Sequence, residues 1–168
     1  MIQRSVRAIA LAIAASAAVV LFNPSAALAS FTNRMIINVN SGICMAVAGG
    51  STSNNAGIVQ YTCDGLDRSR WTSISSTVTG YVRIQNLNSG KCLSPAGGSP
   101  VLGVRIVQYN CDSDVSRLWK IVPSGSYYKL QNGHSLLCIT VDGGSGSRNA
   151  PVVQYACDNH NARKWETW

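Results

Sequence analysis

Charged residues are scarce in this sequence. They make up 12% of its 168 residues, about half the share of an average soluble domain. Only 7 residues are acidic and 2 are histidines. The low charge density argues against a highly charged disordered tail. The shortage of carboxylates and imidazoles leaves most acid–base enzymes without the groups that their chemistry needs.

Sequence patterns of particular active sites are missing as well. No Gly-x-Ser-x-Gly elbow occurs, so nucleophilic catalysis has no support. Glycoside hydrolysis needs two positioned carboxylates, whereas the only glutamate is Glu166 and no pair of aspartates is an obvious candidate. His134 and His160 lie in polar turns without a repeated partner, which is typical of surface histidines. No CxxC or Cys/His knuckle spacing is present, and we predict a non-catalytic protein without metal or cofactor.

One long apolar run is present, and it lies at the N-terminus. Arg4 and Arg7 precede an uncharged stretch over residues 8–22, and Ala27-Leu28-Ala29 supplies a small-x-small cleavage site. A run of about 15 residues is short for a membrane span. We therefore predict that residues 1–29 are a secretory signal peptide, with an uncleaved N-terminal anchor as the alternative. No other stretch is apolar enough to cross a bilayer, so we expect a secreted, extracellular protein.

Cleavage would leave 139 of the 168 residues and lower the formal charge from +7 to +5, because Arg4 and Arg7 leave with the peptide. The remaining chain contains all 6 cysteines. An oxidising compartment favours disulfides over free thiols. Export and the cysteine content therefore point to the same environment.

The remaining chain repeats three times. Each repeat contains two cysteines 19 residues apart, and a tryptophan follows the second cysteine by 8 residues. A Gly-Gly-Ser lies between the cysteines, and the second cysteine ends the phrase Val-Gln-Tyr-x-Cys-Asp. We place the domain at residues 30–168 and its units at about 31–79, 80–125 and 126–168. The pairs with their tryptophans are Cys44/Cys63 and Trp71, Cys92/Cys111 and Trp119, and Cys138/Cys157 and Trp165.

Each unit has the pattern of about four short strands. Residues 82–87 alternate apolar and polar side chains, as a half-buried strand does, and residues 127–130 are their counterpart in the third unit. The Val-Gln-Tyr-x-Cys phrase is another strand, and the tryptophan opens a fourth. Gly-Gly-Ser is typical of a turn. We predict an all-β domain whose three units close about a pseudo-threefold axis, which removes exposed sheet edges.

The repeat also predicts the cysteine pairing. Six cysteines allow 15 connectivities. Equal spacing makes the three pairs within units the simplest choice, because a geometry that permits one of them permits all three. Each disulfide would close a loop of about 20 residues and contribute on the order of 3 kcal/mol to stability.

These motifs resemble the ricin B-type lectin family, over nearly all of residues 31–168. The resemblance implies a β-trefoil that binds carbohydrate without catalysis at up to three shallow sites. The family places an aromatic platform for a sugar ring two residues before the second cysteine, where this chain has Tyr61, Tyr109 and Tyr155. An aromatic face suits the apolar C–H patch of a pyranose.

Other parts of the family's site are altered. Its sugar-binding aspartate, two residues after the first cysteine, is replaced by Ala46, Ser94 and Thr140. Its Asn-Gln before the tryptophan is replaced by Arg68-Ser69, Ser116-Arg117 and Ala162-Arg163. Asp142 lies two residues beyond Thr140, and residues two apart in a strand point to the same face. We therefore favour a third-unit site with Tyr155, Asp142 and Arg163, while a turn-forming role for Asp142 is the alternative.

Basic residues recur before each tryptophan: Arg68 and Arg70, then Arg117, then Arg163 and Lys164. They form either a solvated rim or a site for an anionic glycan, since arginine suits carboxylate and phosphate. Nucleic acid is not expected, because no stacking-plus-basic groove is evident. A trefoil that has lost sugar binding and binds a protein instead is the alternative function. Gln60, Gln108 and Gln154 also recur, and their amides can form hydrogen bonds with either the backbone or a sugar. Asp64, Asp112 and Asp158 recur at strand ends, where an aspartate most often forms an Asx-turn.

Overall fold

The computed structural model describes residues 30–168. The predicted signal peptide, residues 1–29, lies outside the described part. Twelve short strands are present, four in each unit, as the repeat predicts. The first unit contains β1 (Arg34–Asn38), β2 (Cys44–Val47), β3 (Ile58–Tyr61) and β4 (Arg70–Ser75). The second contains β5 (Val82–Asn86), β6 (Cys92–Pro95), β7 (Ile106–Tyr109) and β8 (Trp119–Ser124). The third contains β9 (Tyr127–Asn132), β10 (Cys138–Val141), β11 (Val152–Tyr155) and β12 (Trp165–Thr167).

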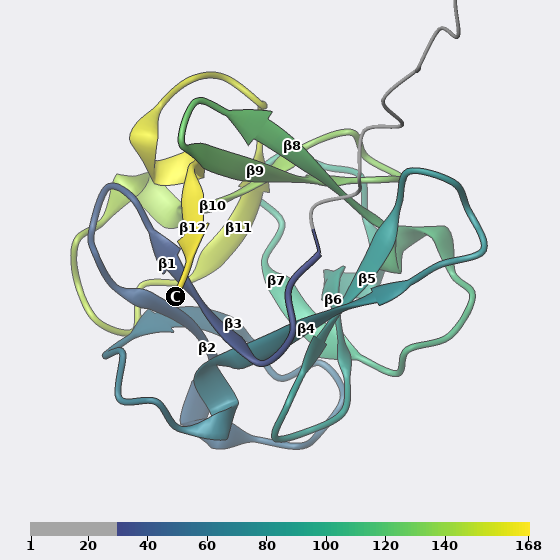
Figure 1. The fold of residues 1–168 in the computed structure, drawn as a ribbon, viewed down its shortest axis with the longest axis horizontal. Helices are drawn as coiled ribbons and strands as arrows, with labels where there is room; N and C mark the ends of the chain where they lie inside the picture. The colour runs from purple at the N-terminus through teal and green to yellow at the C-terminus, as the bar shows by residue number, and fades with distance from the viewer. Residues whose placement is uncertain (1–29) are drawn as a thin grey trace, which may run out of the picture.

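Six of the strands form a closed barrel (Figure 1). In the order β1, β4, β5, β8, β9 and β12, each pairs antiparallel with the next, and β12 returns to β1. The ring therefore has no free edge, as the threefold closure requires. The predicted all-β, trefoil architecture is confirmed.

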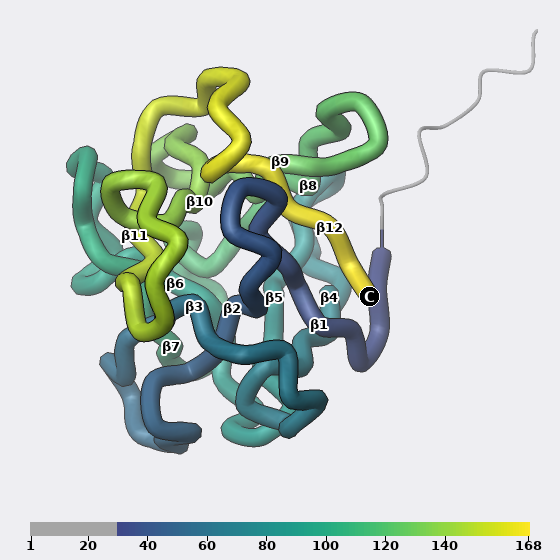
Figure 2. The backbone as a smooth tube through the Cα atoms, turned by 90° about the vertical axis from the view of Figure 1, so that its left-hand side faces the viewer, coloured from purple at the N-terminus to yellow at the C-terminus, as the bar shows by residue number. Residues whose placement is uncertain are grey.

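The other six strands form three hairpins: β2–β3, β6–β7 and β10–β11. Single bridges join the hairpins to one another, from Gly57 to Val107, from Val59 to Pro151 and from Arg105 to Val153. Figure 2 shows β3, β7 and β11 gathered on the side of the molecule away from the C-terminus. The hairpins thus form a three-part layer whose parts touch pairwise.

The three repeated tryptophans lie in the core. Trp71, Trp119 and Trp165 are fully buried among aliphatic side chains from every unit. Each indole Nε1 donates to a backbone oxygen 26 residues earlier, at Met45, Leu93 and Ile139, over 2.9, 3.0 and 3.2 Å. A buried indole N–H needs such a partner.

The predicted disulfides are confirmed. Cys44–Cys63, Cys92–Cys111 and Cys138–Cys157 are bonded, and no free cysteine remains. Each disulfide joins the start of one hairpin strand to the residues just after the other. The Cα–Cα distances are 5.1, 5.0 and 4.9 Å, so the three units place their disulfides alike.

The repeated glutamines tie one unit to another. The buried Gln60 amide donates to the carbonyl oxygens of Ser145 and Ser147 in the third unit, over 2.7 and 2.6 Å, and its Oε1 accepts from Ser41. Gln108 holds the first unit and Gln154 the second in the same way. Of the two roles left open by the sequence, the structure shows the backbone role. The loop that leads into the third strand of each unit is therefore held against the hairpin of the following unit, and the loop of the third unit is held against the hairpin of the first.

Two single-turn 3₁₀ helices occur in each unit and frame the candidate site. One follows the second strand and contains the Gly-Gly pair: η1 (Ala48–Gly50), η3 (Ala96–Gly98) and η5 (Asp142–Gly144). The first glycine of each pair has a φ near +60°, which favours glycine. The other turn precedes the tryptophan: η2 (Asp67–Ser69), η4 (Val115–Arg117) and η6 (Asn161–Arg163).

Candidate carbohydrate-binding hollows

Three equivalent surface hollows lie between these turns and the end of the third strand of each unit. Their volumes are about 300, 300 and 420 Å³ for the first, second and third unit. The first hollow is lined by Val47, Gly49, Val59, Tyr61, Arg68 and Asn149. The second is lined by Asn55, Ser94, Pro95, Gly97, Gly98, Val107, Tyr109, Asp114 and Arg117. The third is lined by Thr140, Val141, Asp142, Gly143, Gly144, Val153, Tyr155, His160, Ala162 and Arg163.

All three predicted platform tyrosines line these hollows. Each is the last residue of the third strand of its unit and lies opposite the first cysteine in the hairpin register. Tyr61 and Tyr109 are half-buried, whereas Tyr155 is 44% exposed. The third unit therefore presents the most accessible ring.

An arginine lies over every one of these rings. The guanidinium carbons of Arg68, Arg117 and Arg163 are 4.9, 4.7 and 4.9 Å from the ring centroids of Tyr61, Tyr109 and Tyr155. This distance is typical of a cation–π contact. Arginine and tyrosine line the same hollow in each unit, so a ligand that enters meets both groups. The sequence predicted the tyrosines and a recurring cation, but not that they would stack.

The stacked arginines come from different sequence positions. Arg68 lies three residues before its tryptophan, whereas Arg117 and Arg163 lie two residues before theirs. In an alignment to the family's Asn-Gln, Arg68 falls at the Asn position and the other two arginines fall at the Gln position. In the structure all three guanidiniums lie over the platform tyrosine of their unit. The long arginine side chain makes this convergence sterically accessible.

The repeated aspartates hold these arginines. Arg68 pairs with Asp64, and Arg163 pairs with Asp158 over 3.2 Å. The same aspartates accept the backbone N–H two residues later, which confirms the predicted Asx-turns. Each carboxylate thus fixes a turn and orients a guanidinium, and it compensates the charge of that guanidinium.

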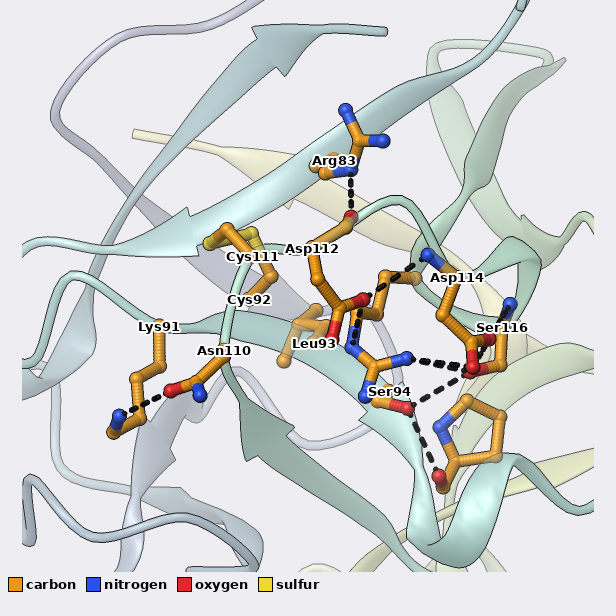
Figure 3. A network of polar contacts seen from close by, with 12 residues as sticks. Arg83, Lys91, Cys92, Leu93, Ser94, Asn110, Cys111, Asp112, Asp114 and Ser116 are labelled. Atoms are coloured by element: carbon orange, nitrogen blue, oxygen red, sulfur yellow. Dashed lines mark hydrogen bonds and ion pairs between the residues drawn. A yellow bond between two sulfur atoms is a disulfide. The ribbon is translucent and has the colours of Figure 1, made fainter.

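The second hollow has the densest polar network (Figure 3). Arg117 lies 3.1 Å from Asp112 and 3.2 Å from Asp114. Asp114 also accepts from the backbone N–H of Ser116 over 2.8 Å and from its hydroxyl over 2.7 Å. These hydrogen bonds, with a smaller effect of Arg117, hold the pKa of Asp114 below its usual 3.8. Two carboxylates thus face one guanidinium there.

The third hollow brings together the residues predicted for it. Asp142, Tyr155 and Arg163 all line it. The prediction that Asp142 shares a strand with Thr140 and points to the same face is wrong, however. Strand β10 ends at Val141, and Asp142 opens the η5 turn. A turn at that point leaves the carboxylate exposed at the edge of the hollow. His160 lines the hollow too, and its Nδ1 accepts from the N–H of Ala162 over 3.1 Å; sequence reasoning treated it only as a surface residue.

The residues at the positions of the family's aspartate are largely buried in this chain, although two of them line the hollows. Ala46, Ser94 and Thr140 are all buried. The Ser94 hydroxyl donates to the Pro95 oxygen over 3.0 Å, and the Thr140 hydroxyl donates to the Ala162 oxygen over 3.1 Å. Both hydroxyl protons are taken up by backbone oxygens, so the arginines, the tyrosine hydroxyls and the rim supply the other hydrogen-bond donors of the hollows.

Two of the three hollows are completed by a loop from another unit, whereas the third is lined by its own unit alone. Asn149 of the third unit lines the first hollow, and Asn55 of the first unit lines the second. Arg148 of the third unit lies over Tyr61, with its guanidinium carbon 5.5 Å from the ring centroid. Sequence reasoning missed these residues, because it assigned each site to a single unit.

Within residues 30–168, no cluster of three or more His, Cys, Asp or Glu residues could hold a metal ion. In the same range, no helix is long and apolar enough to cross a membrane.

A protein-family model described as a ricin-type β-trefoil lectin domain-like region matches residues 33–79, 73–155 and 123–167. A search of curated proteins gave no match. Among solved structures, the chain is 29% identical to ThreeFoil, a designed threefold-symmetric protein, with a TM-score of 0.77 over 80% of this chain and 96% of that one.

Two natural proteins show the same likeness. An exo-β-1,3-galactanase from Clostridium thermocellum is 28% identical, with a TM-score of 0.78 over 81% of this chain. The match covers only 30% of the galactanase, so the likeness carries no conclusion about galactanase activity in this chain. The Rhizoctonia solani agglutinin shares the fold at 19% identity, with a TM-score of 0.74 over 82% of this chain and 94% of that one.

Proposed function

Since the chain belongs to the ricin-type β-trefoil lectin domain-like family, we propose that it is a secreted, non-catalytic carbohydrate-binding protein. The observation that supports this most is the recurrence of one hollow, with one tyrosine and one stacked arginine, in all three units. The proposal includes export by the signal peptide at residues 1–29 and a folded domain at residues 30–168.

The binding groups that we propose are Tyr61, Tyr109 and Tyr155, with Asp142 and Arg163 in the third hollow. A sugar ring lies against a tyrosine with its C–H face, and its hydroxyls meet the guanidinium and the rim. The third hollow is the strongest candidate, because it is the largest and its tyrosine is the most exposed. Shallow single sites bind weakly, so useful avidity comes from several hollows on one polymer.

The test compares two exposed tyrosines. Tyr155→Ala removes a ring from the third hollow, while Tyr127→Ala removes a ring that is 37% exposed and lines no hollow. Retention on insoluble polysaccharides and binding on a glycan array should fall roughly tenfold for Tyr155→Ala, as expected from the loss of one aromatic contact. Tyr127→Ala should bind like the unaltered protein. Equal behaviour of the two variants on every glycan would contradict a role of the third hollow.

The second candidate is a trefoil that binds a protein instead of sugar. Two observations favour it: the family's aspartate positions are buried, and guanidiniums already cover the tyrosine rings. Absence of any glycan binding by the unaltered protein would support this reading over the first.

A further inference from the structure

We propose that the first hollow selects an acidic sugar, a uronate, and that Arg148 from the third unit is the residue that selects it. This inference rests on the proposed carbohydrate binding and names the ligand class of one hollow. It concerns a residue outside the unit in which the hollow lies.

The position of Arg148 is built into the fold. The buried Gln60 amide holds the carbonyl oxygens of Ser145 and Ser147, and the N–H of Asn149 donates to the Gln60 backbone oxygen over 2.9 Å. Arg148 lies between these fixed points. These bonds fix the backbone of Arg148 next to the first hollow, and its exposed side chain places the guanidinium carbon 5.5 Å from the centroid of the Tyr61 ring.

Two guanidiniums share the Tyr61 ring. Those of Arg68 and Arg148 lie 4.9 and 5.5 Å from its centroid, whereas Tyr109 and Tyr155 each have one. Of the three platform tyrosines, only Tyr61 therefore has two cations over its ring.

The ion pairs around the three platform tyrosines differ. In the first, Asp64 compensates Arg68, and Arg148 forms no ion pair with any described residue. In the second, two carboxylates face one arginine. In the third, Asp158 compensates the arginine and Asp142 adds a negative charge. Arg83 and Lys129 donate to the carbonyl oxygens of Asp112 and Asp158, so cations lie beside those two hollows as well. The first hollow differs in that a guanidinium without a carboxylate partner lies over its tyrosine ring, where an anionic ligand can pair with it.

The guanidinium geometry favours a carboxylate. Its planar fork presents parallel N–H donors that match the two oxygens of a carboxylate. Arg148 has all of its donors free of partners in the described chain, so it loses no internal bond when it binds. When the C–H face of a uronate packs on the Tyr61 ring, the carboxylate of the same sugar can reach the neighbouring Arg148 guanidinium.

The equivalent positions of the other units supply matched variants. The position equivalent to Arg148 is occupied by Asn54 in the first unit and by Leu102 in the second. Each of the three residues lies four positions before the third strand of its unit. Arg148→Asn therefore installs a residue that the same frame already carries. Leu102→Arg places an arginine at the equivalent position of the second-unit loop, which Gln154 holds against the third unit.

The experiment measures full-length protein against matched glycosides by calorimetry and by amide chemical shifts. The pairs are methyl galactoside with methyl galacturonide and methyl glucoside with methyl glucuronide, with a sulfated galactoside as a further arm. At low ionic strength the uronides should bind roughly fivefold more tightly than their neutral partners, the size of an exposed ion pair. Added salt should reduce this ratio. The uronides should shift the amides around Tyr61 and Asn149.

Arg148→Asn should bring the ratio to about one, while Leu102→Arg should raise the ratio in the third hollow. Equal binding of neutral and acidic sugars by the unaltered protein would overturn the inference and leave the proposed function standing. The same holds if Arg148→Asn keeps the uronide preference, or if the sulfated sugar is preferred to the uronide. If no glycoside of either kind binds, the inference fails. The proposed function fails with it only if the glycan array and the insoluble polysaccharides also show no binding.

Discussion

Gln60 offers a sharp test of how the three units are held together. Its side chain is fully buried and makes three hydrogen bonds, two of them to the third unit. Each such bond contributes about 1 kcal/mol net. The Ser145 and Ser147 carbonyls lie in a surface loop and regain water when the amide is removed. We therefore expect Gln60→Ala to lower the free energy of unfolding by about 2–4 kcal/mol.

The assay is urea and thermal unfolding followed by circular dichroism. For a domain of this size the loss corresponds to a fall in Tm of roughly 6–12 °C. Gln131→Ala is the matched control, since that half-buried amide donates once, over 2.8 Å, to Leu136 in its own turn. It should lose less than about 1 kcal/mol. If the two variants lost the same stability, the inter-unit hydrogen bonds would not hold the ring together as described.

Two further predictions concern stability. Replacing Cys92 and Cys111 together by alanine opens one of three equivalent loops with a separation of 19 residues, and should lower the unfolding free energy by about 3 kcal/mol in chemical denaturation; an unchanged urea midpoint would contradict this. Because the folded-state pKa of Asp114 is lowered, its stabilisation is present above pH 3.8 and is lost as the pH falls through the folded value. Asp114→Asn should therefore flatten the acid side of the stability profile, and an unchanged profile between pH 5 and about 2 would refute the argument.

The repeat made most of the fold predictable. Strand count and cysteine pairing follow from the repeat, because whatever holds one unit must hold three. Val82 to Asn86 shows the expected alternation of buried and half-buried residues. Strand β4 begins at Arg70, one residue before the tryptophan that was expected to open it. The proposed unit boundaries stay a prediction.

The candidate site was less predictable. Sequence alone placed Tyr61, Tyr109 and Tyr155 in equivalent positions, since the strand phrase that contains them repeats. It could not show that Arg68 lies over its tyrosine as Arg117 does. The two arginines differ by one residue in their distance from the tryptophan, and the flexible arginine side chain compensates for that difference. It also could not show that Arg148 belongs to the first unit's tyrosine, because that contact spans 87 positions and exists only once the ring has closed.

The closed barrel has a consequence for the order of the chain. The backbone of Met35 and that of Trp168 exchange two hydrogen bonds, over 3.1 and 3.0 Å, so the ends of the barrel sequence lie side by side. The join between β12 and β1 is one antiparallel pairing among six of the same kind. A circular permutant that links these ends and opens the exposed loop at 77–79 would keep every strand partner. In such a molecule the unit that we number first would be last, and the first and second hollows would still receive Asn149 and Asn55 from the same neighbours.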